Sequence, residues 1–418
     1  MRPYRTRLGD SAAIGLVILA MLMATTCRAA VRPDAWVGAW GFSSTSFVPT
    51  KAPSANASVA PADFDNVTVR QIVRIVQPAN RIRIRLSNEF GDAPLHVGAV
   101  HVALAGEDGS TLPGSDHVLR FSGRPDSWVP AGAPLLSDAV DWKIPPLSKL
   151  AISIYLPERT TPPAHRLSEY ISAPGDFTAA QTLPEGTLAR SGALISELDI
   201  VSPSARRVLV TLGDSITEGF GSTVNEFRGW SDRLAERLAD NRATRDWSVV
   251  NAGINSNRLL HNGPGTGALA RFDRDVLSVP GVAAIILLEG INDIGYSNTV
   301  PSEGVGAQEI IAAYRQLIER AHARGISVIG ATITPFEGAH YYVPAGEQVR
   351  QTVNAWIRAG GAFDGVIDFD AAMRDPAHPT QVKPDLQRGD HLHPNDTGYA
   401  AMADAIELRL FSKPLKKH

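Results

Sequence analysis

The sequence predicts an α/β protein in which a parallel sheet, covered by helices on both faces, follows an all-β sandwich or jelly-roll domain. From Arg206 onward, short apolar runs alternate with amphipathic segments. Strands that alternate with helices indicate a parallel sheet between two helical layers. Between Trp36 and Leu198 the patterns are those of strands and turns, without a long helical pattern. That half is therefore typical of a sandwich.

The composition is that of a globular protein with a sizeable core. The chain has 418 residues, of which 44% are hydrophobic and 20% charged. This length allows two or three domains. The net charge of −3 gives no reason to expect nucleic acid as a partner. Cys27 is the one cysteine of the sequence, which excludes disulfides within the chain and multi-cysteine metal sites.

The first 30 residues have the layout of a secretory signal peptide. Arg2, Arg5 and Arg7 precede an apolar run over residues 12–24, and small residues follow. The run is short for a bilayer, which takes about 20 residues. We therefore expect a signal peptide over residues 1–30 and a secreted or periplasmic protein, without stable membrane insertion after cleavage. A lipoprotein anchored through Cys27 is the alternative.

Strict alternation marks the strands of the first domain, predicted over residues 35–200. In residues 80–86, apolar side chains alternate with three arginines, so the apolar ones face a core and the arginines face outward. Residues 100–104 and 150–156 repeat the alternation, and residues 88–92 and 106–109 look like turns. Outward charges protect sheets against edge pairing, so we expect the arginine stripe to be a solvated face. A ligand-binding face is the alternative.

The character of the chain changes near Ser202, and the second domain is predicted over residues 204–413. Its apolar runs predict strands over residues 208–212, 247–251, 282–288, 327–332 and 365–368. Its amphipathic segments predict helices over residues 229–240, 306–323, 346–359 and 396–410. In such sheets, ligands bind at the carboxyl ends of the strands. Residues that follow the strands are therefore the candidates for chemistry.

Ser215 stands where the first of these strands ends and a helix can begin. Gly213 permits a tight bend just before it. A serine at such a turn can attack a carbonyl while backbone N–H groups face the oxyanion that forms. An Asp/Ser cap of a helix after a core strand is the structural alternative.

A serine nucleophile needs a base, which is usually a histidine oriented by a carboxylate. Asp390 and His393 lie three residues apart just before the last predicted helix, and His391 is a rival base. The Ser215 and Gly253 backbone N–H groups and the Asn292 side-chain amide are candidate oxyanion donors. As structural alternatives, Gly253 is a turn glycine at a strand end and Asn292 a turn residue bonded to its own backbone.

Together these residues resemble the SGNH or GDSL-type hydrolase family. Its four blocks match Gly213-Asp214-Ser215, Asn251-Ala252-Gly253, Gly290-Ile291-Asn292-Asp293 and Asp390-His391-Leu392-His393, with Ile216 in place of the usual leucine. The spacing of Asp and His in the last block selects His393. The resemblance implies a three-layer α/β/α flavodoxin-like domain, a Ser215-His393-Asp390 triad, and an oxyanion hole of Ser215, Gly253 and Asn292, with no cofactor and no metal.

Residues 85–91, 257–260 and 288–295 also resemble an exported bacterial branch similar to arylesterases and acetylxylan esterases. That resemblance implies short-chain carboxylic esters as substrates, either small esters or acetylated polysaccharide, including O-acetyl groups of the plant cell wall. One alternative is a lipase, phospholipase or acyltransferase with the same triad. Another is a carbohydrate-binding protein with an inert hydrolase domain. The sequence leaves the oligomeric state and the role of the β domain open.

Three loops are candidates for choosing the substrate: residues 262–267, 296–305 and 336–344. The last contains Phe336, His340, Tyr341 and Tyr342. These rings could stack on a sugar or line an acyl pocket, and they could equally pack the loop against the rest of the protein.

Overall fold

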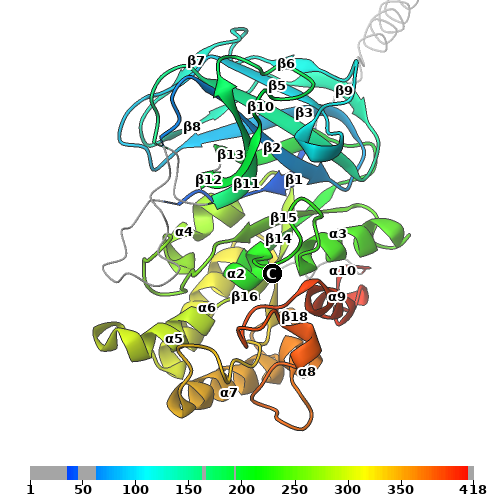
Figure 1. Cartoon of the computed structure of the whole chain (residues 1–418). Coiled ribbons are helices and arrows are strands. Elements are labelled where there is room, and N and C mark those ends of the chain that lie inside the picture. Colours follow the sequence, from blue (N-terminus) through cyan, green and yellow to red (C-terminus); the bar gives the residue numbers. More distant parts are fainter. Residues whose placement is uncertain (1–34, 46–62, 162–165, 193, 413–418) are drawn as a thin grey trace, which may run out of the picture. The chain divides into compact units, whose positions relative to one another are not determined.

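The computed structural model describes residues 35–45, 63–161, 166–192 and 194–412 (Figure 1). The predicted signal peptide and Cys27 lie outside these residues. The chain from Trp36 onward forms one compact unit. Within it, the last strand of the β region ends at Val201 and the first strand of the α/β region begins at Arg207. In the described ranges, no helix has the length and apolar character needed to cross a membrane.

The β region is a sandwich of two antiparallel sheets. In the described residues, one sheet has the order β1-β13-β3-β8, with β9 also paired to β3, and the other has the order β12-β11-β2-β10-β5-β6. The strands of the first sheet are β1 (Trp36–Gly41), β3 (Ala79–Asn88), β8 (Ala133–Leu136), β9 (Val140–Ile144) and β13 (Ile195–Val201). Those of the second are β2 (Val67–Ile75), β5 (Ala99–Leu104), β6 (His117–Leu119), β10 (Ser148–Leu156), β11 (Arg166–Pro174) and β12 (Thr187–Gly192). A small ribbon pairs β4 (Leu95–Val97) with β7 (Ser127–Val129).

The alternation along β3 separates core from surface, as predicted. The core residues of β3 are Ile82, Ile84 and Leu86, each with 0% of its surface exposed. The three arginines between them point away from this core, but they are half-buried instead of solvated. Arg83, for example, pairs with Asp199 and lies over the ring of Trp36. Ion pairs and cation–π contacts thus cover much of the stripe that the sequence predicted to face water.

The α/β region is built on a parallel sheet with the order β15-β14-β16-β17-β18 (Figure 1). Its strands are β14 (Arg207–Gly213), β15 (Trp247–Gly253), β16 (Val282–Leu288), β17 (Ser327–Ala331) and β18 (Gly365–Ile367). The first strand in sequence lies between the second and the third, which is the flavodoxin-like order. All five predicted strands are present. The topology places a ligand crevice at the carboxyl end of β14, where the connections diverge to the two sides.

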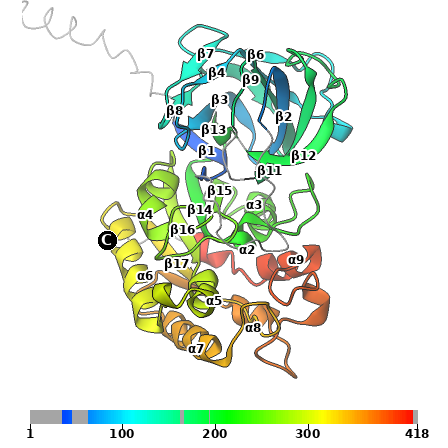
Figure 2. The same ribbon diagram turned by 60° about the vertical axis from the view of Figure 1, so that its left-hand side comes forward.

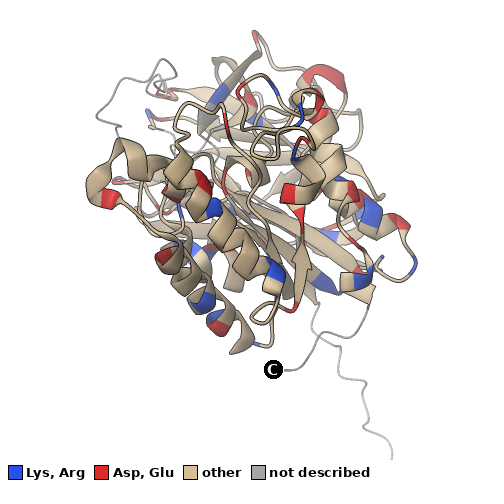
Figure 3. Ribbon diagram, turned by 90° about the horizontal axis from the view of Figure 1, so that it is seen from below, with Lys and Arg blue, Asp and Glu red and all other residues tan. Residues whose placement is uncertain are grey.

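Helices cover both faces of this sheet (Figure 2). Along β16, Ile285 and Leu287 join one apolar cluster with α4, α6 and α7, whereas Ala284 and Ile286 join another with α3, α8 and α9. The helices are α2 (Ser215–Glu218), α3 (Trp230–Asp240), α4 (Ala268–Phe272), α5 (Ile291–Thr299), α6 (Ala307–His322), α7 (Pro344–Ala359), α8 (Phe369–Met373), α9 (Asp396–Asp404) and α10 (Arg409–Ser412). Short turns of helix are η1 (Glu107–Gly109), η2 (Asp273–Leu277), η3 (Pro301–Glu303) and η4 (Pro384–Leu386). Figure 3 shows acidic and basic residues interspersed along the helices.

Two predicted segments differ from the structure. The helix expected over residues 396–410 is broken into α9 and α10, and the Arg237 side chain donates to the carbonyls of Ala403 and Ile406 at the break. A cation there satisfies carbonyls that a continuous helix would bond internally. The loop expected over residues 296–305 begins as the last turn of α5. The apolar α5 residues Ile291 and Ile294 are buried, and this burial favours the helix.

Strand β1 of the sandwich lies along β15, the edge strand of the parallel sheet (Figures 1 and 2). The approach is close because β1 has glycines there. A Cβ on Gly38 would lie 2.9 Å from Val250 Cγ2, and one on Gly41 would lie 2.4 Å from Val250 Cγ1. The Gly38 N–H donates to the Pro280 carbonyl (2.9 Å). The sandwich thus covers an edge that would otherwise be open to pairing.

Candidate active site

The turn after β14 places Ser215 at the carboxyl edge of the sheet. A Cβ at Gly213 would lie 2.2 Å from the Leu288 carbonyl oxygen, so only glycine fits at the end of this strand. Asp214 caps helix α2, since its Oδ1 accepts the Ile216 N–H (2.8 Å). The predicted cap is therefore present, and its residue is Asp214. Ser215 follows as the first residue of α2 with 4% of its surface exposed.

A chain of two short hydrogen bonds joins Ser215, His393 and Asp390. Ser215 Oγ lies 2.9 Å from His393 Nε2, and His393 Nδ1 lies 2.8 Å from Asp390 Oδ2. A carboxylate on Nδ1 favours the tautomer with its proton there, which leaves Nε2 free to accept the serine proton. Ser215 is distant in sequence from Asp390 and His393, and the fold brings them together at one rim. Their geometry is that of a nucleophile, a base and an orienting acid.

The Asp390 carboxylate is held in its ionised form. Burial alone would raise its pKa, but hydrogen bonds from the His393 side chain and from the His393 and Leu392 backbone N–H groups outweigh it. They hold the pKa of Asp390 well below its usual range. His391, the rival base, is exposed and adopts a left-handed φ of 58°. The turn that lets Asp390 reach His393 thus directs His391 outward.

The three candidate oxyanion donors differ in whether their N–H groups already have an acceptor. The Ser215 N–H begins helix α2 and has no carbonyl one turn earlier to bond. Asn292 is buried, and its Nδ2 donates one bond to the Asn257 carbonyl (2.9 Å), so one of its two N–H groups is used. The Gly253 N–H donates to Asn251 Oδ1 (2.8 Å). The Gly253 donor is therefore already engaged, which the sequence pattern could not show.

Gly253 also has a packing role. A Cβ at this position would lie 2.2 Å from the Glu218 backbone nitrogen and 2.7 Å from Glu218 Cα. The end of β15 therefore contacts the backbone of α2 directly. Any side chain larger than hydrogen at residue 253 would displace the helix that begins with Ser215.

Buried carboxyl groups lie beneath the turn. Burial raises the pKa of Asp214 to about 7, and burial with the neighbouring Asp214 and Asp293 raises the pKa of Glu289 well above its ordinary value. Asp293 accepts the Leu259 and Leu260 N–H groups (2.6 and 3.0 Å). These groups hold the backbone behind the site. The sequence pattern gave no signal for Glu289 as a member of this cluster, because its side chain meets Asp214 only in the fold.

One predicted specificity loop packs inward, and another is partly helical. In residues 336–344, Phe336 and Tyr341 are buried, and the Tyr341 hydroxyl lies 3.3 Å from Asn292 Oδ1. The sequence left open whether these rings contact the substrate or pack the loop against the protein. Phe336 and Tyr341 pack behind Asn292. His340 is exposed and Tyr342 is half-buried. Residues 262–267 are irregular, as expected, whereas residues 296–299 belong to α5.

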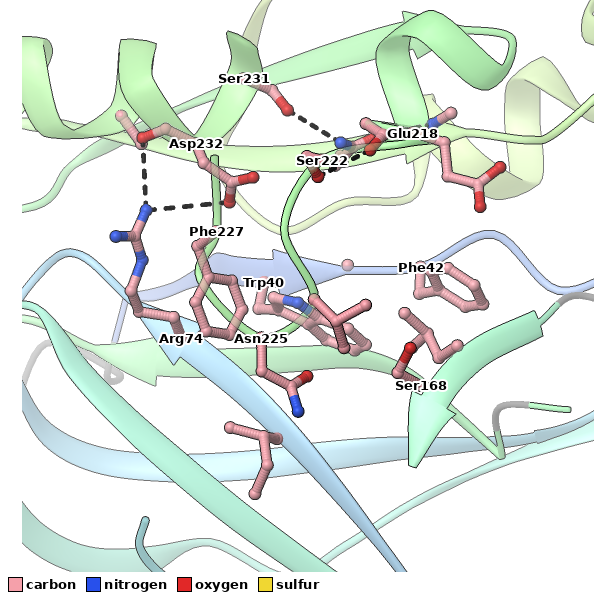
Figure 4. A pocket seen from close by; sticks show the side chains of 18 of the residues that line it. Trp40, Phe42, Arg74, Ser168, Glu218, Ser222, Asn225, Phe227, Ser231 and Asp232 are labelled. Atoms are coloured by element: carbon pink, nitrogen blue, oxygen red, sulfur yellow. Dashed lines mark hydrogen bonds and ion pairs between the residues drawn. The ribbon is translucent and has the colours of Figure 1, made fainter. Parts of the chain in front are cut away.

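A cavity of about 200 Å³ lies beside the site, between the sandwich and the segment that follows α2 (Figure 4). Phe220 borders it, and the Phe220 ring centroid is 4.7 Å from that of His393. The sequence pattern did not predict this cavity, since its walls come from both halves of the chain. In the described ranges, no group of three or more His, Cys, Asp or Glu side chains is placed to hold a metal ion.

Comparisons with known proteins match part of the chain to one family. Residues 211–401 match the model of the GDSL-like lipase/acylhydrolase family. This segment contains Ser215, Gly253, Asn292, Asp390 and His393. Over this segment, the chain is similar to the GDSL-like lipases and acylhydrolases, and this similarity supports a hydrolase acting on esters.

Similar solved structures cover about half of the chain. A lipolytic protein of the G-D-S-L family from Desulfitobacterium hafniense DCB-2 is 20% identical, with 47% of this chain and 96% of that chain covered and a TM-score of 0.37. A catalytic mutant of an acetylxylan esterase from Geobacillus stearothermophilus is 22% identical, with 50% and 95% covered and a TM-score of 0.38. A GDSL-like lipase from Bacteroides thetaiotaomicron VPI-5482 is 20% identical, with 49% and 88% covered and a TM-score of 0.37. The search of curated proteins returned no match.

Proposed function

We propose that the protein is a serine esterase in which Ser215, His393 and Asp390 form the catalytic triad. The observation that carries the proposal is the pair of bonds at 2.9 and 2.8 Å through the His393 imidazole. In the first half-reaction, Ser215 Oγ attacks the ester carbonyl carbon while His393 takes the serine proton. His393 then gives that proton to the alcohol oxygen as the ester C–O bond breaks, and an acyl-enzyme remains.

In the second half-reaction, water takes the place of Ser215 as the nucleophile. His393 takes a proton from water, the hydroxide adds to the acyl carbon, and the Ser215 oxygen leaves with that proton. Asp390 fixes the imidazole tautomer and stabilises its charged form in both steps. The Ser215 N–H and the second Asn292 amide hydrogen face the oxyanion. Gly253 joins them when its N–H, which donates to Asn251 Oδ1, is shared with the substrate oxygen.

The substrates in this proposal are short-chain carboxylic esters, among them O-acetyl groups on plant cell-wall polysaccharide. The resemblance in residues 85–91, 257–260 and 288–295 supports this finer assignment. A comparison of acetyl and long-chain esters of one alcohol tests it. A faster turnover of acetyl esters is expected. A strong preference for long chains would favour the lipase, phospholipase or acyltransferase alternative instead.

The triad assignment has a direct test. Ser215→Ala removes the nucleophile and should lower kcat by about 10⁴- to 10⁶-fold, as losses of triad members do. His391→Ala is the matched control, because this histidine is exposed in the same turn, and it should keep near-normal turnover. Near-normal turnover in Ser215→Ala would refute the mechanism. If the wild-type protein releases no acyl group from any activated ester but retains polysaccharide, the inert binding protein is the correct alternative.

We also propose that residues 1–30 direct export. Their basic, apolar and small-residue regions support this. Expression of the full chain in a bacterial host, followed by N-terminal sequencing of the periplasmic or secreted form, should find a chain that begins near residue 30. A full-length chain retained in the cytoplasm would contradict the proposal, and a lipidated Cys27 at the new N-terminus would show the lipoprotein alternative.

A further inference from the structure

We propose that the cavity between the sandwich and residues 219–228 binds a six-membered ring carried by the alcohol part of the ester. This inference rests on the esterase function proposed above. The cavity volume is about 200 Å³, and a cavity of about 150 Å³ is enough to hold benzene. The cavity is therefore large enough for one ring with a few substituents. It lies where two parts of the fold meet, which is a common location of ligand pockets.

Aromatic side chains from the sandwich form one wall of the cavity. Trp40 and Phe42 lie two residues apart on and just after β1, so their side chains lie on the same side. Their rings are stacked, with centroids 6.2 Å apart and an interplanar angle of 11°. Figure 4 shows both rings and the Ser168 side chain among the residues that line the cavity. Two nearly parallel rings beside a hydroxyl suit a flat ring that also carries polar groups.

Phe220, in the segment that follows α2, connects the cavity to His393. Phe220 borders the cavity, and its ring packs against the His393 imidazole at 4.7 Å. His393 is the group that must protonate the leaving alcohol oxygen. The Phe220 side chain therefore lies between a ring in the cavity and the imidazole that protonates the alcohol oxygen. This position assigns the cavity to the alcohol part of the ester rather than to the acyl part.

The sandwich also fixes the shape of this wall. Asn225 and Phe227 have φ values of 57° and 53°, a left-handed conformation that costs energy for residues other than glycine. Lys149 Nζ donates to the Asn225 carbonyl (2.8 Å), and the Arg74 guanidinium lies 5.0 Å from the Phe227 ring centroid. Contacts from the sandwich thus stabilise the strained segment. The cavity is preorganised, which lowers the entropic cost of binding.

Blocking the cavity tests the inference. Ser168→Phe fills it from a half-buried position, and Trp40→Leu removes a stacking ring. Each should lower kcat/KM for phenyl acetate about tenfold or more, since aromatic contacts are lost or excluded. Ethyl acetate has the same acyl group without a ring, so its kcat/KM should change less than twofold. Trp128→Ala is the control, because Trp128 is 50% exposed on β7 and does not line the cavity.

A series of esters distinguishes a sugar ring from an aryl ring, and it distinguishes failure of the cavity assignment from failure of the esterase function. An acetylated methyl pyranoside joins phenyl acetate as a second ring ester, and the ester that loses more shows whether a sugar or an aryl ring fits. Equal changes in all esters, or none, would overturn the cavity assignment while leaving the esterase function intact. Activity that survives Ser215→Ala would instead remove the function on which the assignment rests.

A separate observation concerns Arg271, and from it we infer a positioning role for this residue. Arg271 lies on α4 with 1% of its surface exposed. Its guanidinium donates to the carbonyls of Gly213 (3.1 Å) and Ala252 (2.8 Å) and to Asn257 Oδ1 (3.0 Å). It thus joins the end of β14 to the chain at and just after the end of β15, two segments that are distant in sequence. They include the strand ends that precede Ser215 and Gly253.

Each of these bonds bears on a proposed oxyanion donor. The Ala252 carbonyl shares a peptide plane with the Gly253 N–H, so a bond to one fixes the direction of the other. The Asn257 backbone carbonyl accepts a hydrogen bond from Asn292 Nδ2 (2.9 Å). The Asn257 side chain accepts one from Arg271. The Gly213 carbonyl lies at the entrance to the Ser215 turn. Five donors in a rigid fork can hold three such groups at once, which a lysine cannot do.

The test compares two buried arginines. Arg271→Lys should lower kcat about 10²-fold with KM changed less than threefold, because oxyanion donors act in the transition state. Binding of a boronate, which mimics the tetrahedral intermediate, should weaken by a similar factor. Arg350→Lys is the control. Arg350 is equally buried and holds the Ile333 carbonyl and Asp370, which lie outside the catalytic turn. It should change melting temperature without changing kcat per folded molecule.

Two outcomes would overturn the role of Arg271. One is a folded Arg271→Lys variant with wild-type kcat and boronate affinity. The other is an equal loss of kcat in both arginine variants. If Arg271→Lys does not fold, Asn257→Ala removes the side chain that Arg271 holds but keeps the carbonyl that accepts from Asn292. This variant should still weaken boronate binding more than it changes KM. Unchanged boronate binding in that variant would also contradict the inference.

Discussion

At the scale of single residues, the structure brings together three of the residues that the sequence proposed for the site, but not every hydrogen bond around them was predictable. Ser215, His393 and Asp390 meet in the structure with the contacts that their types suggested. The engagement of the Gly253 N–H by Asn251 and the burial of Arg271 were not predictable. Both depend on how strand ends and helices pack, and residue type or spacing does not encode that packing directly.

The low pKa of Asp390 leads to a prediction about pH. Since its carboxylate stays ionised throughout the range in which an imidazole titrates, acid should inactivate the enzyme through the imidazole base and not through Asp390. The logarithm of kcat/KM should then fall with a single slope of one as pH drops, because only neutral imidazole is a base. A pH–rate profile with a stable short-chain ester measures this. A slope of two, or activity that is flat far into acid, would contradict the prediction.

Asp390→Asn should leave the fold intact but favour the wrong tautomer of His393. We expect kcat to fall by about 10⁴-fold, as replacement of a triad aspartate does. The matched control is Asp396→Asn, which changes a nearby carboxylate that bonds Thr223 instead of the imidazole. Turnover of Asp390→Asn within tenfold of the wild type would show that the carboxylate does not orient the base.

The raised pKa of Asp214 predicts a pH dependence of stability with the opposite sign from a salt-bridged acid. Burial raises this pKa to about 7, so between about pH 4 and 7 the folded state binds a proton that the unfolded state has lost. This group therefore makes the free energy of unfolding fall as pH rises through that window. Asp214→Asn keeps an oxygen for the Ile216 N–H and should remove part of the fall. Denaturant titrations at pH 4.5 and 7.5 measure the difference, and an unchanged pH slope would refute it.

At the scale of elements, periodicity predicted the strands and long helices of the α/β region well. Strand β16 begins and ends at the predicted residues, and α3, α6 and α7 lie within two residues of their predicted bounds. Short elements were less predictable, because α4, α8 and η2 contain too few turns for a period to emerge. The break between α9 and α10 was hidden because the capping group, Arg237, lies in a different helix.

The contact between β1 and β15 leads to a prediction about packing. Gly41→Ala places a Cβ 2.4 Å from Val250 Cγ1, and the stiff valine cannot move aside freely. We expect a loss of about 1–3 kcal/mol in the free energy of unfolding. Gly361→Ala is the control, since no heavy atom lies within 4 Å of its added Cβ. The double variant with Val250→Ala should recover part of the loss, and strict additivity would show that the two residues do not meet.

At the scale of the whole molecule, the sandwich and the α/β region share one apolar core. A single cluster of buried side chains runs from Ile84 in the sandwich through Val37 and Val250 to Leu287 in the parallel sheet. Polar contacts join the same regions, including Gln77 Nε2 to the Trp247 carbonyl (2.7 Å) and Arg271 to Ser43 Oγ (3.2 Å). The sequence predicted two domains from their different patterns, and these patterns carry no information about the contacts between them.

A shared core predicts one cooperative unfolding transition for the chain from residue 35 onward. Calorimetry should give a single peak whose calorimetric and van't Hoff enthalpies agree. A fragment of residues 204–413 would expose the Val250 side of β15 and should melt at a lower temperature or aggregate. Two resolved peaks, with the second reproduced by that fragment alone, would show that the two regions fold independently.

The covered edge of β15 has a consequence for the order in which the chain is made. Synthesis proceeds from the N-terminus, so β1 and its partner β13 are complete once Val201 has been added, before any residue of β15 exists. The sandwich can therefore fold first and present β1 as a preformed surface. When Trp247–Gly253 emerges, its edge is covered as it forms, with little time in which another chain could pair with it. The first half of the chain thereby serves as an internal scaffold for the second, apart from any part it plays in catalysis.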